Sequence, residues 1–245
     1  MNLRSQLRKY VRSYPQWGFA PPRVQVQRRL ERIGTEYGGY YLAPSLMKPD
    51  AVVYSVGIGE DISFDQSLIE TFGVEIEAFD PTPKVKEWLA SQALPEQFHF
   101  HAMGIADADG EAVFHLPPRK DWVSHSMISA RQYSRETESF PVTRLSTAMA
   151  RLGHSRIDVL KMDIEGAEYG VIEDLVGTQI PVGQLLVEFH HRLSSFGTGD
   201  TRRAISLLEE YGMKIGHVCP RMEVFTFIPS GLRESRRTRD FPREE

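Results

Sequence analysis

The stretch "IDVLKMDIEGAEY", residues 157–169, joins an apolar run to a sudden cluster of acids. Its first half has the length of a buried β-strand, and its second half places Asp163, Glu165 and Glu168 within six residues. Buried charges cost free energy unless they are paired or bind something, so a purely structural strand seldom ends in this way. The stretch therefore predicts a functional site at the end of an interior strand.

Strands and helices alternate on both sides of this stretch. Short β-branched runs bounded by glycine or acids predict strands, and the longer runs between them predict helices. Helical crossovers imply parallel pairing, whereas the two-residue link at 220–221 implies one antiparallel hairpin. We therefore predict an α/β fold with a mainly parallel sheet. The predicted strands are 51–57, 74–80, 98–106, 111–117, 157–163, 184–191, 213–219 and 222–228, and the predicted helices are 63–73, 84–94, 145–153, 167–177 and 201–212.

Size and composition limit the class of protein. The chain has 245 residues, a net charge of −4 and one cysteine, which excludes an intramolecular disulfide framework. We find neither an apolar run of membrane-spanning length nor an apolar leader, so we expect a cytoplasmic protein without a transmembrane segment. Three parts are expected: a basic arm with an aromatic, turn-rich segment (1–49), one folded domain (50–230) and a disordered polar tail (231–245).

The N-terminal arm concentrates positive charge. Residues 1–32 contain eight Arg or Lys against one Glu, so the rest of the chain is acidic. We interpret this arm as a solvated extension that pairs with acids of the body. The alternative is that it docks on an acidic partner or a membrane surface.

Two motifs in the first half indicate a ligand that contains a nucleoside. Gly57 and Gly59 follow the first predicted strand, where glycine lets the backbone approach a ligand closely, and Asp61 stands near the place of a third glycine. Asp80 ends the next strand, 23 residues after Gly57, and a carboxylate there accepts hydrogen bonds from ribose hydroxyls. The ligand is then NAD or S-adenosylmethionine (SAM). The missing third glycine and the terminal hairpin favour SAM.

Six blocks of the sequence resemble the FkbM family of SAM-dependent methyltransferases. They are "VVYSVGIGED", "EAFDPTP", "FHAMGIADADGEAVFH", "VTRLST", "IDVLKMDIEGAEY" and "LLVEFHH". The resemblance implies a SAM-dependent methyltransferase domain over 50–230. Its fold would be the Rossmann-like class I methyltransferase sheet of seven strands, with a C-terminal antiparallel hairpin. The implied reaction is methylation of a hydroxyl oxygen. The glycine loop and Asp80 depart from the family's usual G-x-N-x-G and Glu.

The end of the third strand supplies further candidates for binding SAM. In the class I fold this position borders the adenine ring, so the resemblance implies apolar contacts from Ile105 and Ala106. Asp107 would accept a hydrogen bond from the exocyclic amine. The alternative is that Asp109 and Gly110 only form a turn before the next strand.

Asp163, Glu188 and His190 are expected to meet in one crevice, because they follow neighbouring strands and alternate residues of a strand share a face. Asp163 points to where the methyl group must be presented, so it is also a candidate for binding SAM. Three roles compete for the acids and the histidine. His190 is a general base, oriented by Asp163 or Glu188, that takes the proton of a hydroxyl acceptor. Alternatively, the three residues bind Mg²⁺ or Mn²⁺, with Glu165 as an extra ligand. In a structural role, Glu165 caps the following helix. We favour the metal-free base.

The methyl acceptor is not encoded in a recognisable motif. We expect a small molecule or a glycan, contacted by the polar segment 118–141, the N-terminal arm and residues 191–200. No continuous basic groove is expected on the acidic body, so a nucleic acid is not the expected partner. A homo-oligomer is left open. The rival functions are an NAD-linked oxidoreductase on a related fold and a non-catalytic module that binds a nucleoside.

Overall fold

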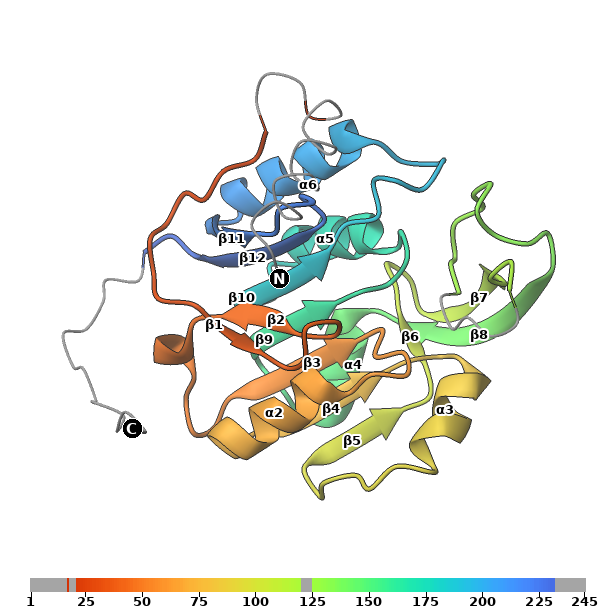
Figure 1. Ribbon diagram of the computed structural model, residues 1–245, viewed down its shortest axis with the longest axis horizontal. Helices are drawn as coiled ribbons and strands as arrows, with labels where there is room; N and C mark the ends of the chain where they lie inside the picture. Colours follow the sequence, from red (N-terminus) through yellow and green to blue (C-terminus); the bar gives the residue numbers. More distant parts are fainter. Residues whose placement is uncertain (1–16, 18–20, 120–124, 232–245) are drawn as a thin grey trace.

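A seven-stranded sheet lies at the centre of the protein, where Figure 1 shows its strands between the helices. The computed structural model describes residues 17, 21–119 and 125–231. The strand order is β11-β12-β10-β9-β3-β4-β5, with β12 antiparallel to both of its neighbours and the other pairs parallel. The predicted α/β class and the C-terminal hairpin are therefore confirmed. The strands are β3 (Val52–Val56), β4 (Glu75–Phe79), β5 (Phe98–His101), β9 (Ile157–Met162), β10 (Val182–Glu188), β11 (Met213–Val218) and β12 (Val224–Pro229).

The strand order reverses between β3 and β9. From β3 the chain proceeds through β4 to β5 at one edge, and from β9 it proceeds through β10 towards the other edge. Val56 and Met162 are partners at the last register position of β3 and β9, and Asp163 N donates to Val56 O at 3.0 Å. The residues that follow the two strands therefore begin side by side, which is where open parallel sheets bind ligands.

Helices cover both faces of the sheet. Leu145, Ile172 and Leu208, from α4, α5 and α6, pack into one apolar core, whereas Phe64 and Val85, from α2 and α3, pack into the other. These residues belong to the apolar face of each helix, which gains stability by leaving water. The helices are α2 (Ser63–Phe72), α3 (Pro83–Leu89), α4 (Leu145–Leu152), α5 (Glu168–Gly177) and α6 (Thr198–Glu210). In the part of the chain that the structure describes, no helix is long and apolar enough to cross a membrane.

A second sheet, which the sequence did not reveal, lies beside the first (Figure 1). It has the order β6-β8-β7, with β6 at Gly104–Ile105, β7 at Gly110–His115 and β8 at Thr137–Thr143. The predicted strand 98–106 is thus divided between two sheets. The predicted strand 111–117 belongs to the small sheet, and the end of the segment predicted to be irregular is strand β8. Phe114 and Phe140 give this sheet its own small core.

Residues 31–46 form a hairpin and a short turn that pack on the main sheet. They comprise β1 (Glu31–Ile33), β2 (Tyr40–Leu42) and the 3-10 helix η1 (Pro44–Leu46). Leu42 is fully buried. Gln184, on β10, forms hydrogen bonds through its side chain with the backbone of Ala43, and Ala43 N donates to Gln184 Oε1 at 2.7 Å. The last part of the expected N-terminal arm is therefore part of the folded body. Most of the basic arm and the tail 232–245 lie outside the described residues.

Candidate active site

A cavity of about 840 Å³ opens at the carboxyl ends of the central strands. This volume lies within the range of small-molecule and cofactor sites. The loops after β3, β4, β9 and β10 line it, together with β6 and the hairpin strand β2. Most of the predicted site residues meet here: Gly57, Gly59, Asp61, Asp80, Ile105, Asp163, Glu188 and His190.

The glycine loop is held by hydrogen bonds at both ends. Gly57 has a left-handed backbone with φ +70°, and its N–H donates to Phe79 O at 2.9 Å. A Cβ at this position would lie 1.8 Å from Asp163 O, so only glycine fits. Gly59, with φ +57°, donates its N–H to Asp80 Oδ2 at 3.2 Å. Both hydrogen bonds thus fix the loop to the end of β4, while Asp163, which follows β9, closes the space beside Gly57.

Asp80 is held in one orientation at the cavity wall. Its Oδ1 accepts hydrogen bonds from Thr82 N at 3.0 Å and Thr82 Oγ1 at 2.7 Å, and the residue is 6% exposed. Asp61 also lines the cavity, and its Oδ1 accepts a hydrogen bond from Ser63 N at the start of α2. Both acids therefore organise the backbone around the cavity and face it at the same time.

The structure separates the three candidates predicted at the third strand. Ile105 lines the cavity, whereas Ala106 is buried in the core of the small sheet. Asp107 does not line the cavity: its carboxylate lies against α5, where a Cβ on Gly170 would be 3.1 Å from Asp107 Oδ2. The prediction that Ala106 and Asp107 face the ligand is therefore not supported. The strand from Phe98 ends at His101, so the next residues leave the main sheet.

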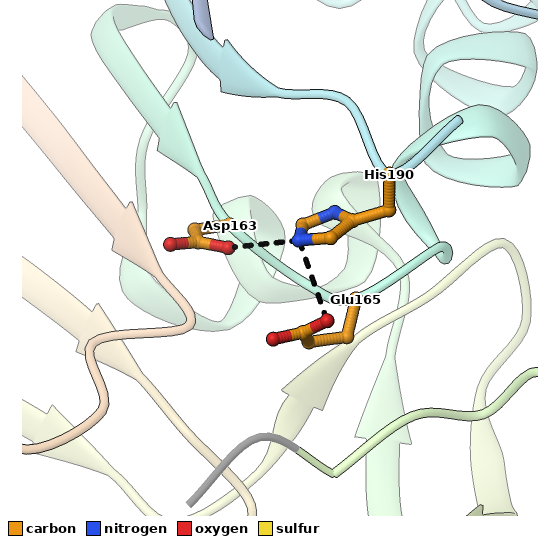
Figure 2. Close-up of side chains that lie close together, drawn as sticks. All are labelled: Asp163, Glu165 and His190. Carbon is orange, nitrogen blue, oxygen red and sulfur yellow. Dashed lines mark ion pairs between the residues drawn. The ribbon is translucent and has the colours of Figure 1, made fainter. Parts of the chain in front are cut away.

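His190 lies among three carboxylates, and Figure 2 shows two of them, those of Asp163 and Glu165. Its Nε2 is 3.5 Å from Asp163 Oδ1 and 3.4 Å from Glu165 Oε2, and its Nδ1 is 3.4 Å from Glu168 Oε1. Burial acts to lower the pKa of His190, but the Glu168 carboxylate beside Nδ1 and the charges of Glu165 and Asp163 outweigh it. The net effect raises the pKa of His190 well above its ordinary value. An imidazole that keeps its proton is a poor proton acceptor, which weighs against the predicted role as general base.

Glu188 faces the same cavity without a hydrogen bond or ion pair from its side chain among the described residues. Burial is the main cause that raises its pKa, and the Asp163 charge adds to the rise, while the His190 charge opposes it. Together they raise the pKa of Glu188 to about 8. This carboxyl is thus placed to exchange a proton near neutral pH.

The acids after Asp163 have roles that differ from helix capping. Glu165 accepts a hydrogen bond from the Tyr133 hydroxyl at 2.7 Å, and no side chain caps the N-terminus of α5. The capping role predicted for Glu165 is therefore wrong. Glu168 is fully buried and accepts hydrogen bonds from Gly166 N at 2.8 Å and His190 N at 2.7 Å. It ties the turn after β9 to the end of β10.

Three further residues at the site escaped the sequence analysis: Tyr40 and Lys161 line the cavity, whereas Tyr133 contacts a residue that lines it. The Tyr40 hydroxyl donates to Asp163 Oδ2 at 3.4 Å, and Tyr133 reaches Glu165 from the segment that was expected to contact an acceptor. Lys161 is buried, and its Nζ donates to Val56 O at 3.3 Å and to Gly57 O. A lysine inside an apolar strand was a visible signal for the third residue, because a buried ammonium needs partners.

Asp65 gives a test of the electrostatics beneath the glycine loop. Burial raises its pKa to about 6, although the Lys161 charge and Ser55 act in the opposite direction. The pKa of Asp65 in the folded protein exceeds the ordinary pKa of 3.8. The protonated carboxyl therefore contributes its full stabilisation of the fold below pH 3.8, and this stabilisation is lost as pH rises through the folded-state pKa. We expect the free energy of unfolding of wild type to fall by about 3 kcal/mol relative to that of Asp65→Asn between about pH 4 and pH 7. Urea unfolding at several pH values measures this.

The matched control for this test is Glu70→Gln, which changes an exposed acid on the same helix. Its stability difference from wild type should stay nearly constant over the same pH interval. If Asp65→Asn also keeps a constant difference, the carboxyl of Asp65 titrates normally in the folded protein.

Comparison with known proteins agrees with this arrangement. The family model described as the methyltransferase FkbM domain matches residues 49–215. The chain belongs to the FkbM methyltransferase family. The match begins just before β3 and extends into β11, so the FkbM domain includes the glycine loop, Asp80 and the acids around His190.

Two curated relatives share this domain. The chain is 27% identical over 183 residues to a protein of Homo sapiens named "Probable methyltransferase-like protein 24", covering 71% of this chain and 43% of that protein. The protein of the same name from Rattus norvegicus is 28% identical over 181 residues, covering 71% and 43%. The chain therefore spans less than half the length of these relatives.

Two solved structures give more distant matches. The fibrillarin pre-rRNA processing protein of Methanococcus jannaschii matches with a TM-score of 0.46 and 14% identity, covering 80% of this chain and 72% of that chain. Aeropyrum pernix fibrillarin, solved with natively bound SAM, matches with a TM-score of 0.42 and 10% identity, covering 84% of each chain.

Proposed function

We propose that this protein is a SAM-dependent methyltransferase that acts on a hydroxyl oxygen of a small molecule or glycan. The observation that carries the proposal is one shared cavity, which the glycine loop and Asp80 line together with Asp163, Glu188 and His190. A nucleoside site and a group able to take a proton thus face the same space.

The lining residues fit SAM by their chemistry. Asp80 presents a fixed carboxylate for the ribose hydroxyls, and the apolar residues Phe79 and Ile105 suit the adenine ring. The left-handed glycines keep side chains out of the loop beside them. When bound, SAM supplies a methyl group on a sulfonium: the S–CH₃ bond breaks, an O–CH₃ bond forms, and the electron pair stays on the sulfur of S-adenosylhomocysteine.

Glu188, once it is ionised as pH rises through about 8, is the proposed group that accepts the proton of the acceptor hydroxyl. Its carboxylate lines the cavity and has no competing hydrogen bond or ion pair among the described residues. His190 lies among carboxylates that hold its proton, so it serves this role less well. We propose that Asp163 and His190 instead shape the floor on which the acceptor sits.

The two rival functions are separated by ligand binding and turnover. An NAD-linked oxidoreductase would bind NAD, whereas we expect calorimetry to detect SAM and S-adenosylhomocysteine but not NAD. A non-catalytic module would bind SAM without ever forming S-adenosylhomocysteine. Incubation with methyl-labelled SAM and a panel of monosaccharides and phenols distinguishes that case, because the proposed enzyme transfers label to an acceptor.

Asp80→Ala tests the cofactor half of the cavity. We expect this change to weaken SAM binding by about 1–3 kcal/mol, because the ribose hydroxyls lose a charged acceptor. Calorimetric titration with SAM measures the loss. Glu87→Ala is the control, because Glu87 is an exposed acid on α3. This variant should bind SAM with the affinity of wild type. Unchanged affinity in Asp80→Ala removes Asp80 from the site.

A further inference from the structure

Three potential ligand atoms converge at the floor of the cavity (Figure 2). One atom each from Asp163, Glu165 and His190 lies within 4.8 Å of the other two, and the side chains point toward one another. We propose that these three residues form a binding site for a divalent cation, Mg²⁺ or Mn²⁺. The donor set differs from the sequence-based alternative, because Glu165 takes the place given to Glu188.

The donor atoms suit this cation class. Two carboxylates and one imidazole offer hard oxygen ligands with a single nitrogen, a set typical of Mg²⁺ and Mn²⁺ and distinct from thiolate sites for zinc. All three side chains line the cavity, so further coordination positions face its open space. That opening leaves room for waters or a substrate oxygen.

The supporting framework is rigid. Asp163 and His190 follow β9 and β10, which pair in parallel up to Met162 and Val187. Ligands at the ends of paired strands keep their separation better than ligands on long loops. The turn that carries Glu165 is tied to β10 by the fully buried Glu168.

The back of the imidazole provides an observation independent of the converging atoms. His190 Nδ1 is buried and makes no hydrogen bond in the described part of the chain, and Glu168 Oε1 lies 3.4 Å from it. Histidines that bind a metal through one nitrogen present the other N–H to a carboxylate or carbonyl, which fixes the ring. Glu168 stands where such a carboxylate is needed.

Two tyrosines support the carboxylates in a similar way. Tyr133 donates to Glu165 and Tyr40 donates to Asp163, each from a different segment of the chain. Hydrogen bonds of this kind orient ligating carboxylates. Tyr133 also links the cation site to the segment expected to contact the acceptor.

The chemical role of the cation rests on the proposed methyl transfer to a hydroxyl. The existence of the cation site does not depend on that proposal. A divalent cation lowers the pKa of a hydroxyl next to it, so the acceptor oxygen becomes a better nucleophile. The proton of the acceptor would pass to Glu188, whose side chain lines the same cavity. The inferred acceptor is one whose oxygen can approach a cation, such as a vicinal diol or a catechol.

Direct binding of Mn²⁺ tests the site without any acceptor. We would treat the full chain with a chelator, remove the chelator, and titrate Mn²⁺ while recording the free ion by electron paramagnetic resonance. We expect one saturable site, with Mg²⁺ competing for it. Glu165→Gln should weaken Mn²⁺ binding at least about 10-fold, and Tyr133→Phe by about 10-fold. Glu173→Gln, an exposed acid on α5, should bind like wild type.

Circular dichroism and SAM titration of each variant separate the two proposals. Loss of Mn²⁺ binding in a folded Glu165→Gln protein that still binds SAM supports the cation site. Absence of saturable Mn²⁺ binding in wild type, or equal affinity in Glu165→Gln, overturns it. Saturable Mn²⁺ binding together with no SAM binding in wild type leaves the cation site standing and overturns the proposed function.

Discussion

Replacing Glu188 with glutamine is expected to slow methyl transfer to a hydroxyl acceptor by about 10²–10⁴-fold, while SAM still binds. The amide has nearly the same shape as the carboxyl group but cannot take the acceptor's proton. Glu188 lines the cavity beside Asp163 and His190, so its loss removes the proposed proton acceptor without altering the glycine loop. The measurement is the rate of S-adenosylhomocysteine release with an acceptor found in the hydroxyl panel.

Glu223→Gln is the matched control for this prediction. Glu223 lines the same cavity, but its carboxylate pairs with Arg192 and Arg221, each at 2.7 Å. A carboxylate that is paired with two arginines has no role as a base. Glu223→Gln should therefore change the rate of methyl transfer only slightly. A normal rate in Glu188→Gln, combined with a rate lost in His190→Gln, would restore the imidazole as the base.

The main sheet could be predicted because its strands carry strong local signals. Runs such as Val52–Val56 and Ile157–Met162 are apolar and short, and the helices between them impose parallel order. The terminal hairpin followed from a link too short for a crossover. These features depend on neighbouring residues alone, which makes them visible in a sequence.

The small sheet and the N-terminal hairpin could not be predicted for the opposite reason. β8 contains Pro141 and is largely exposed over its first half, so its alternation is weak. β1 and β2 have three residues each and gain their stability from burial on the main sheet, as Leu42 shows. Such strands exist because of tertiary contacts, which leave little trace in local composition.

The candidate site was predicted where it follows strand ends and was missed where it depends on distant segments. Asp163 and His190 meet because β9 and β10 are neighbours, which the topology implied. Tyr40 and Tyr133 reach the same acids from segments more than 30 residues away in sequence. Asp107 faces α5 because the strand before it ends early, and only the three-dimensional path of the chain reveals that.

Replacing Gly57 with alanine is expected to destabilise the protein by about 3–5 kcal/mol and to abolish SAM binding under conditions where wild type is folded. The left-handed backbone at φ +70° accounts for about 1–2 kcal/mol of the loss. The rest comes from the new Cβ, which would lie 1.8 Å from Asp163 O and must push β3 and β9 apart at the cavity. Urea unfolding gives the loss of stability, and calorimetry gives the loss of SAM binding.

Gly73→Ala separates the two contributions, because Gly73 has φ +65° but a Cβ there would meet nothing within 4 Å. This control should lose only the conformational part, about 1–2 kcal/mol, and should bind SAM like wild type. The difference between the two variants then measures how closely the glycine loop is packed against the acid-bearing turn. Equal destabilisation in both would mean that the Gly57 peptide moves away from Asp163 at little cost. In that case the close contact between β3 and β9 would not be what holds the two halves of the cavity together.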